Sequence, residues 1–381
     1  MNALKHIISL TLILLIICGQ PAGAEETDGD FRKYVRDLSS FTFRGLEDAE
    51  PATDSELPPH QDPSFYLYDH DMLLRESYGD FSSGGMALRF GRQQYHSGIG
   101  YAWKPTDLFN PKPFLDPMYG LDGIDSAYMA YSFPGDGEYE ISTFYSFENN
   151  HEGSDDPNVR DGDYQVKVKT HMEVLDLAIH YTEVNRNRTD YEGLISGNVE
   201  PENAVIPVRW RLLSAGISSQ IGGMGIYAEG GHAWLSVDED TDESVEENFA
   251  KDHSKFLVGV DYTFENELYL VLEYYQEGQG KASSKDYTLN DRLGYFSNER
   301  DAIGRDNVFV GARYPIADMT SIELYNIINA NDPSVIVNPW LVWSAGEDVT
   351  VKFSAQIPVG KEDSSLGGAE PSAFAHIQLN F

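Results

Sequence analysis

The feature that most restricts the fold of this chain is a regular alternation of apolar and polar side chains. In KFLVGVDYTFENELYLVLEYY, residues 255–275, Val258 and Val260 lie on one side of an extended chain and Gly259 and Asp261 on the other. The polar stretch FENE follows, and the alternation then resumes. A period of two residues indicates β-strands, and two such runs around a short turn predict a β-hairpin.

The same unit recurs along most of the chain. Short links such as PGDG at 134–137 alternate with long ones such as 96–124 and 278–305, and 329–332 is the one brief exception. Fourteen strands are the alternative count, because the first strand and one other have weak patterns. We predict sixteen strands, at 37–45, 64–77, 84–95, 125–133, 138–148, 162–170, 174–184, 205–218, 222–236, 254–264, 267–277, 306–314, 318–328, 333–343, 348–358 and 372–381.

The sorting of the connections distinguishes two all-β architectures. A soluble β-sandwich also alternates, but nothing in it requires short turns at one end of the strands and long loops at the other. Outer-membrane barrels have this arrangement, with an even number of antiparallel strands of about 10 residues. We therefore predict a transmembrane antiparallel up-and-down β-barrel over residues 37–381. Its closure would pair every backbone group within the lipid.

The N-terminal region has the pattern of a secretory signal peptide. The apolar run IISLTLILLIIC is too short to span a bilayer as a helix and is followed by the small residues AGA. We predict a signal peptide at 1–24 and a short periplasmic segment at 25–36. The only cysteine, Cys18, lies in the signal peptide, so the mature chain has no thiol. A lipid anchor on Cys18 is the less favoured alternative, because Ile17 stands where a small residue is expected.

The charge of the chain excludes one class of partner. Asp and Glu number 62 against 27 Lys and Arg, a formal net charge of −35. Nucleic-acid binding needs a basic surface and is therefore not expected. The segment 237–252 carries eight carboxylates and begins like a calcium loop, but Glu243 replaces the turn glycine that such a loop needs. A solvated acidic loop is favoured over a divalent-cation site.

The phase of the alternation predicts which side chains face the inside of the barrel. Val166 and Val168 would face lipid, so that Lys167 and Lys169 face the lumen. In VRWRL at 208–212, the same reasoning places both arginines inside. Charged side chains set the selectivity of pores, so we predict a basic wall, with Asp176 as the partner of Lys169. The alternative is that these are ordinary solvated residues. The predicted pore-lining residues are Arg89, Lys167, Lys169, Asp176, His180, Arg209, Arg211, Arg313 and Lys352.

Motifs for catalysis are absent from the sequence. It has no Gly-x-Ser-x-Gly, no His-Glu-x-x-His and no phosphate-binding loop. His96 and Ser97 form an adjacent His-Ser pair near a strand end, and a membrane esterase would need a third polar residue beside them. We expect no catalytic residue, no metal and no cofactor.

One segment carries a resemblance to a known family. A strand ending in GRQ is followed by a glycine pair and by WKPTDLFNP, and the chain closes on AFAHIQLNF. These features resemble a group of Gram-negative outer-membrane porin-like β-barrel proteins, over residues 73–133 and the terminal strand. The resemblance implies a location in the bacterial outer membrane, contact with the lipid bilayer and lipopolysaccharide, and assembly by the barrel-assembly machinery through Phe381. Porins of this size are often homotrimers.

In such porins a loop that folds inward commonly narrows the channel, and residues 96–124 suit that role. Gly98 and Gly100 permit a sharp bend. A loop that merely covers the barrel mouth is the alternative. In the constriction model Trp103 would pin the loop to a wall, and the aspartates would face the basic wall across the opening. The residues expected in this loop are Trp103, Asp107, Asp116 and Asp122.

The function predicted from these features is a porin, not an enzyme, that forms a water-filled channel for passive diffusion of small hydrophilic solutes. Two alternatives stay open. One is an outer-membrane hydrolase with an active site at the rim near His96, and the other is a structural or adhesive barrel that displays its acidic loops.

Overall fold

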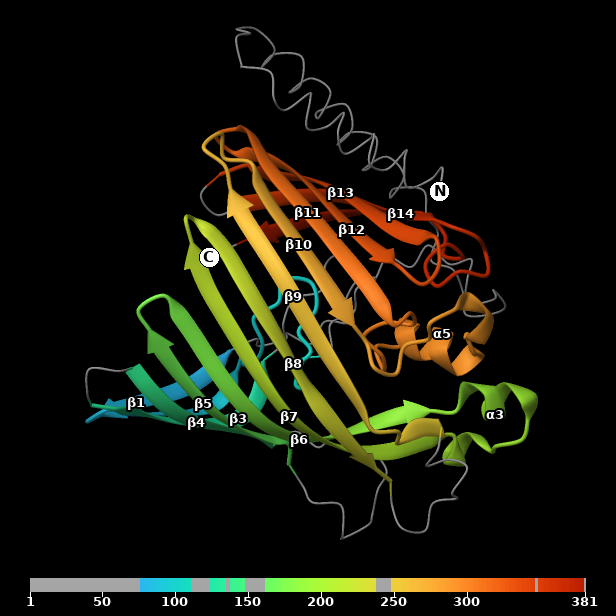
Figure 1. Cartoon of the computed structure of the whole chain (residues 1–381), viewed down its shortest axis with the longest axis horizontal. Helices are drawn as coiled ribbons and strands as arrows, with labels where there is room; N and C mark the ends of the chain where they lie inside the picture. Colours follow the sequence, from blue (N-terminus) through green and yellow to red (C-terminus); the bar gives the residue numbers. More distant parts are fainter. Residues whose placement is uncertain are drawn as a thin grey trace, which may run out of the picture. The chain divides into compact units, whose positions relative to one another are not determined.

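Fifteen β-strands pair in chain order, each antiparallel to the next, into one sheet (Figure 1). The computed structural model describes residues 76–110, 123–134, 138–147, 162–237, 248–346 and 349–379. The strands are β1 (Ser77–Ser83), β2 (Met86–Gln93), β3 (Ile124–Phe133), β4 (Glu138–Ser146), β5 (Tyr164–Met172), β6 (Leu175–Thr189), β7 (Val205–Ile221), β8 (Met224–Ser236), β9 (His253–Thr263), β10 (Tyr269–Gln276), β11 (Asp306–Ala317), β12 (Thr320–Asn329), β13 (Ser334–Ser344), β14 (Val349–Val359) and β15 (Ser372–Leu379).

The predicted all-β, up-and-down antiparallel class is confirmed. The fourteen strands predicted from 84–95 onward correspond to β2–β15. The predicted strand at 37–45, the signal peptide at 1–24 and the segment at 25–36 lie outside the described residues. Short and long connections alternate as expected, and the link between β12 and β13 is again the brief exception.

The first described strand differs from the prediction. The sequence places a strand at 64–77 and a turn after it, whereas β1 begins at Ser77 and the turn lies at Gly84 and Gly85. Both glycines have positive φ, 57° and 83°. Because most other residues avoid this conformation, the glycine pair forms the two-residue hairpin turn. The register pairs Ser83 with Met86 across it.

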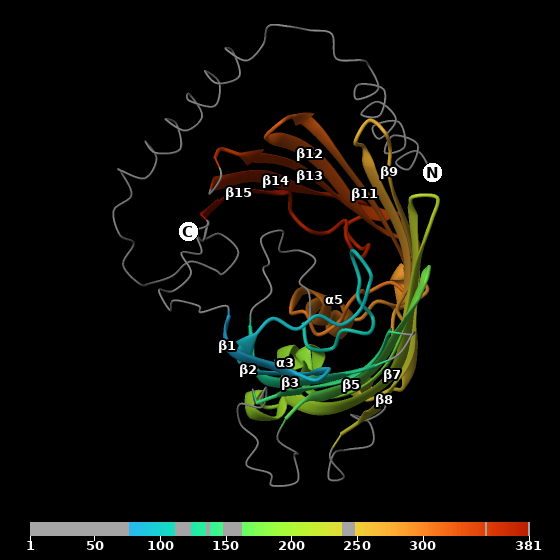
Figure 2. The ribbon, with the colours of Figure 1, turned by 90° about the vertical axis from the view of Figure 1, so that its left-hand side faces the viewer.

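Within the described residues the sheet is not closed into a barrel. β1 and β15 form its two edges, and no pairing joins them among the described residues. Figure 2 shows the sheet bending through a wide arc with these two strands at its ends. The prediction of a closed barrel is therefore met only in its coarser part, a single curved antiparallel sheet.

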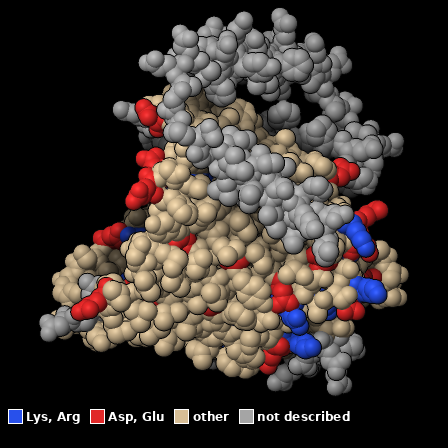
Figure 3. All heavy atoms as spheres, turned by 45° about the horizontal axis from the view of Figure 1, so that its top comes forward, with Lys and Arg blue, Asp and Glu red and all other residues tan. Residues whose placement is uncertain are grey.

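The two faces of the sheet differ in composition. Large apolar side chains are exposed along the convex outer face, including Val168, Leu213 and Leu272, each 48–49% exposed. Figure 3 shows part of this face, where uncharged residues cover most of the surface and charged residues gather towards the edges. The concave inner face instead carries polar and charged residues together with two buried apolar clusters.

Short helices occur only in the long connections of the described chain. They are α3 (Tyr191–Ser196), α5 (Leu289–Phe296) and the 3-10 turns η1 (Pro201–Asn203) and η2 (Ser284–Asp286). Thr288 and Asp291 form a capping box at the start of α5. None of the helices in the described ranges is long and apolar enough to cross a membrane.

Gly91 tests the register between β1 and β2. Its φ is 125°, and a Cβ atom there would collide with the carbonyl oxygen of Ser77. We predict that Gly91→Ala lowers the free energy of unfolding by about 1–3 kcal/mol, measured by denaturant titration. Gly79→Ala in β1 is the matched control, because a Cβ there meets nothing within 4 Å. Equal losses in the two variants would contradict the register.

Candidate functional site

The loop after β2 lies on the concave face of the sheet (Figure 2) and is held there by buried carboxylates. Glu229 of β8 accepts hydrogen bonds from the backbone N–H of Ile99 at 3.0 Å and of Gly100 at 3.2 Å. The hydroxyl of Thr106 donates to the same carboxylate at 2.8 Å. Glu229 therefore satisfies three donors of the loop, and those donors compensate the burial of its charge.

A second carboxylate binds the next part of the loop. Glu273 of β10 accepts the backbone N–H groups of Tyr101 and Ala102, the latter at 2.7 Å. The hydroxyl of Tyr227 also donates to Glu273, at 2.7 Å. Glu273 is fully buried. The two carboxylates thus fix four consecutive residues, 99–102, against the sheet.

Aromatic packing secures the same segment. The ring of Trp103 stacks on Tyr275 with centroids 5.2 Å apart, and Trp103 is buried. Tyr101 stacks on Phe309 at 5.5 Å, and its hydroxyl donates to that of Tyr325 at 2.9 Å. The expectation that Trp103 pins the loop to a wall agrees with this packing. Offset aromatic pairs add about 0.5–1.5 kcal/mol each beyond their buried area.

Asp107 does not face an opening. It is buried, and its carboxylate accepts hydrogen bonds from the backbone of Ser97, Phe109 and Asn110. Burial raises its pKa above the ordinary value, although the side chain of Asn110 and these backbone N–H groups act in the opposite direction. The prediction that Asp107 faces the basic wall is therefore wrong, because the loop uses the carboxylate to close its own turn. Asp116 and Asp122 lie outside the described residues.

The adjacent residues His96 and Ser97 point in different directions. His96 is exposed and lines an inner cavity, whereas Ser97 is fully buried. The Ser97 hydroxyl donates to the carbonyl oxygen of Thr106 at 3.1 Å and lies 3.2 Å from Nδ1 of His180. Ser97 thus contacts His180 rather than His96 and helps to attach the loop to β6.

The predicted basic wall is partly present. Arg89, Lys167 and Lys169 line one cavity of about 290 Å³ on the inner face. Arg89 binds Asp80 through two contacts, at 2.7 and 3.0 Å. Lys169 pairs with Glu140 at 3.2 Å. In the part of the chain that the structure describes, Lys167 has no ion-pair partner, and the cavity holds one more cation than carboxylate.

The two arginines of β7 lie on the other face. In the pairing of β6 with β7, Arg209 lies opposite Asn185 and Arg211 lies opposite Glu183. These positions alternate with Val208, Trp210 and Leu212, which are buried on the inner face. Arg209 forms an ion pair with Glu183, which also accepts the Tyr164 hydroxyl at 2.8 Å. The prediction that these arginines line the pore with Lys167 is therefore wrong.

The inward and outward faces of β7 are the reverse of the predicted ones, because the apolar residues that alternate with its arginines pack against a core on the inner face. Val208, Trp210 and Leu212 are buried on the inner face in one cluster with Leu108 of the loop. The space on the inner side of this end of the strands is therefore filled by packed side chains. The pattern VRWRL is compatible with its apolar residues on either face of the sheet. The packing of the loop against the inner face determines that they lie inside.

The remaining predicted pore residues lie on the inner face. Asp176 binds His171 at 2.7 Å rather than the expected Lys169. His180 is buried against Ser97. The Arg313 guanidinium lies 5.4 Å from the centroid of the Tyr269 ring. Lys352 of β14 pairs across the sheet with Val342 and His376.

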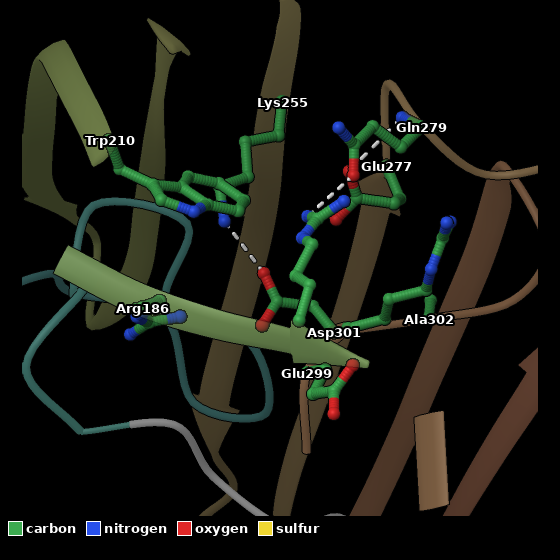
Figure 4. A pocket seen from close by; sticks show the side chains of 10 residues that line it. Arg186, Trp210, Lys255, Glu277, Gln279, Glu299, Asp301 and Ala302 are labelled. Atoms are coloured by element: carbon green, nitrogen blue, oxygen red, sulfur yellow. Dashed lines mark hydrogen bonds and ion pairs between the residues drawn. The ribbon is translucent and has the colours of Figure 1, made fainter. Parts of the chain in front are cut away.

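A second, smaller cavity lies where β6, β7, β9 and the connection after β10 meet (Figure 4). Its volume is about 10 Å³. Figure 4 shows the indole of Trp210 beside Lys255, whose ammonium binds Asp301 at 2.7 Å. Burial alone would raise the pKa of Asp301, but this ammonium outweighs it and holds the pKa below its ordinary value. The cavity is lined by Arg186, Arg188, Trp210, Lys255, Glu277, Gln279, Glu299, Arg300, Asp301 and Ala302.

Glu229 and Glu273, which attach the loop to the sheet, are not among the residues predicted from the sequence. A signal for one of them exists, because Glu273 interrupts the apolar run LYLVLEYY at an inward position. A carboxylate there needs buried donors, which only a segment folded onto the inner face would supply.

Comparison with protein-family models finds no matching family, and comparison with curated proteins finds no significant match. Within the described ranges, no group of three or more His, Cys, Asp or Glu residues is arranged to hold a metal ion.

Removing the Glu273 carboxylate should release the loop. Glu273→Ala leaves the N–H groups of Tyr101 and Ala102 and the Tyr227 hydroxyl without their acceptor. We expect a loss of about 3 kcal/mol in the free energy of unfolding. Amide hydrogen exchange should also accelerate in peptides covering 96–110, as measured by mass spectrometry. Glu265→Ala, at an exposed turn, is the control. Unchanged exchange in Glu273→Ala would refute the anchoring role.

Proposed function

We propose that this protein is an outer-membrane porin, whose sheet closes into a water-filled channel for small hydrophilic solutes. The observation that carries the proposal is the difference between the two faces of the sheet. Large apolar side chains are exposed on the convex face, and charged residues line a cavity on the concave face. Outer-membrane barrels have this composition, with apolar residues facing lipid and polar residues facing the lumen.

Aromatic residues on the outer face support the membrane location. Tyr131 and Phe133 lie near the short-turn end of β3, and Tyr145 and Phe147 lie at the long-loop end of β4. All four aromatic residues are exposed. Met129, an exposed residue that is not aromatic, lies between the two aromatic groups. Such barrels carry aromatic girdles at both membrane interfaces around an apolar band.

The position of the loop is consistent with a channel whose cross-section is narrowed by the loop and not filled by it. Residues 96–110 occupy one part of the inner face through Glu229 and Glu273, while the cavity with Arg89 and Lys167 remains beside it. In a wide barrel side chains alone do not fill the interior, so a loop attached to the inner face narrows the channel. In the proposed channel the loop forms the constriction.

Conductance tests the proposal directly. The full chain, purified in detergent and added to a planar lipid bilayer, should produce discrete steps of steady, ohmic current. The matched control is the same detergent without protein. Insertion without conductance, demonstrated by protease protection in liposomes, would overturn the channel and favour the hydrolase or the structural barrel.

The charged cavity predicts the direction of ion selectivity. Replacing Arg89, Lys167 and Lys169 together with glutamine should lower the anion-to-cation permeability ratio by at least about fivefold, since each unit charge at about 4 Å contributes about 1 kcal/mol in water. The reversal potential under a salt gradient measures this ratio. Arg211→Gln provides the matched control, because Arg211 is an exposed arginine on the outer face. A shift of equal size in the control would contradict the assignment of the two faces.

A further inference from the structure

The small cavity of Figure 4 contains buried hydrogen-bond donors that have no acceptor among the residues the structure describes. They are Nε of Arg188 and Nε1 of Trp210, and both residues are only 4% exposed. The other donors of Arg188 reach neutral oxygens, the Phe249 carbonyl at 3.2 Å and the Gln279 amide at 2.7 Å. A buried donor without a partner costs about 1–3 kcal/mol, and more when it is charged.

The carboxylates that line the cavity bind groups other than Arg188 and Trp210. Asp301 binds the Lys255 ammonium at 2.7 Å. Glu277 accepts the Tyr275 hydroxyl at 2.6 Å and the backbone N–H of Gln279 at 3.2 Å. None of these carboxylates forms an ion pair with Arg188 among the described residues.

Glu299, the third carboxylate of the cavity lining, also binds groups other than Arg188. Glu299 accepts the backbone N–H and the hydroxyl of Thr189 at 3.0 and 2.8 Å. Arg300 pairs with Asp291 at 3.0 Å, outside the cavity lining. Arg186 donates to the carbonyl oxygen of Leu108, a neutral partner. The cavity-lining atoms left unsatisfied in the described chain are therefore donors only.

We propose that this cavity binds one monatomic anion of about the size of chloride. A volume of about 10 Å³ holds one water-sized particle, which excludes phosphate and larger anions. A water molecule would bring two donors of its own, whereas a halide only accepts and so matches a cavity whose unsatisfied buried atoms in the described chain are donors. Cationic groups of Arg186, Arg188 and Lys255 also lie 5.9, 4.9 and 5.6 Å from the centroid of the Trp210 ring.

The bound anion would attach the inner face of β6 and β7 to the segment 277–302. This role is independent of whether the protein forms a channel, because it depends only on the folded chain. Anion binding to the folded state alone raises stability with anion concentration.

Bromide provides the direct test of the site. Crystals of the full chain grown in sodium bromide should show an anomalous scattering peak within hydrogen-bonding distance of Arg188 Nε and Trp210 Nε1. Three results would overturn the proposal: a water in this position without anomalous signal, a carboxylate of residues 238–247 filling the cavity, or an empty site.

Thermal unfolding in detergent provides the test in solution. At constant ionic strength, replacing gluconate by chloride should raise the Tm of the unmodified protein. Trp210→Phe removes the indole N–H while retaining a ring, and Arg188→Gln removes the guanidinium. Each should abolish at least half of the chloride-dependent increase in Tm. Arg211→Gln, on the outer face of the same strand as Trp210, should retain it.

The two substitutions keep the test decisive if one of them prevents folding. When Arg188→Gln does not fold, Trp210→Phe alone decides the outcome. A chloride effect that persists unchanged in every folded variant of the cavity would show that chloride acts elsewhere, and the proposal would fail.

Discussion

The position of the loop depends on the pairing of two buried carboxylates with backbone amides. Glu229 and Glu273 bind the N–H groups of residues 99–102. A buried carboxylate without donors is costly, and buried N–H groups without acceptors are costly as well. The loop therefore supplies donors for the buried carboxylates of the sheet, and the sheet supplies acceptors for the buried N–H groups of the loop. Hydrogen bonds to charged acceptors contribute about 1.5–3 kcal/mol each, which exceeds the contribution of most neutral ones.

The placement of the loop determines what the inside of the sheet is made of. Where residues 96–110 are packed, the inner face carries apolar residues such as Leu257 and Trp210. Where they are not, it carries Lys167 and Arg89 beside a cavity. The inner face therefore has one region packed against the loop and another that borders a cavity. This division explains why the phase of VRWRL is opposite to the phase of YQVKVKT.

Sequence periodicity predicts the strands well, because backbone pairing in an antiparallel sheet follows local alternation. The boundaries of β2–β15 agree with the pattern to within a few residues at most ends. The pattern fails for β1, where Gly84 and Gly85 form the turn. It also fails for Arg209 and Arg211, because alternation specifies that two faces exist and not which of them is packed. Asp107 was expected to face the basic wall, and only the folded loop shows that its carboxylate instead accepts hydrogen bonds from Ser97, Phe109 and Asn110.

The segment 99–102 also has a geometric consequence for the sheet. Glu229 lies on β8 and Glu273 on β10, so these few residues pass over β9, where Leu257 is fully buried beneath them. Neighbouring strands are about 4.8 Å apart, so the segment spans two strand spacings. It therefore links β8 to β10 through contacts that are separate from the backbone pairing of either strand with β9. Changes in length beyond residue 103 would alter the rest of the loop while leaving this link between the two strands in place.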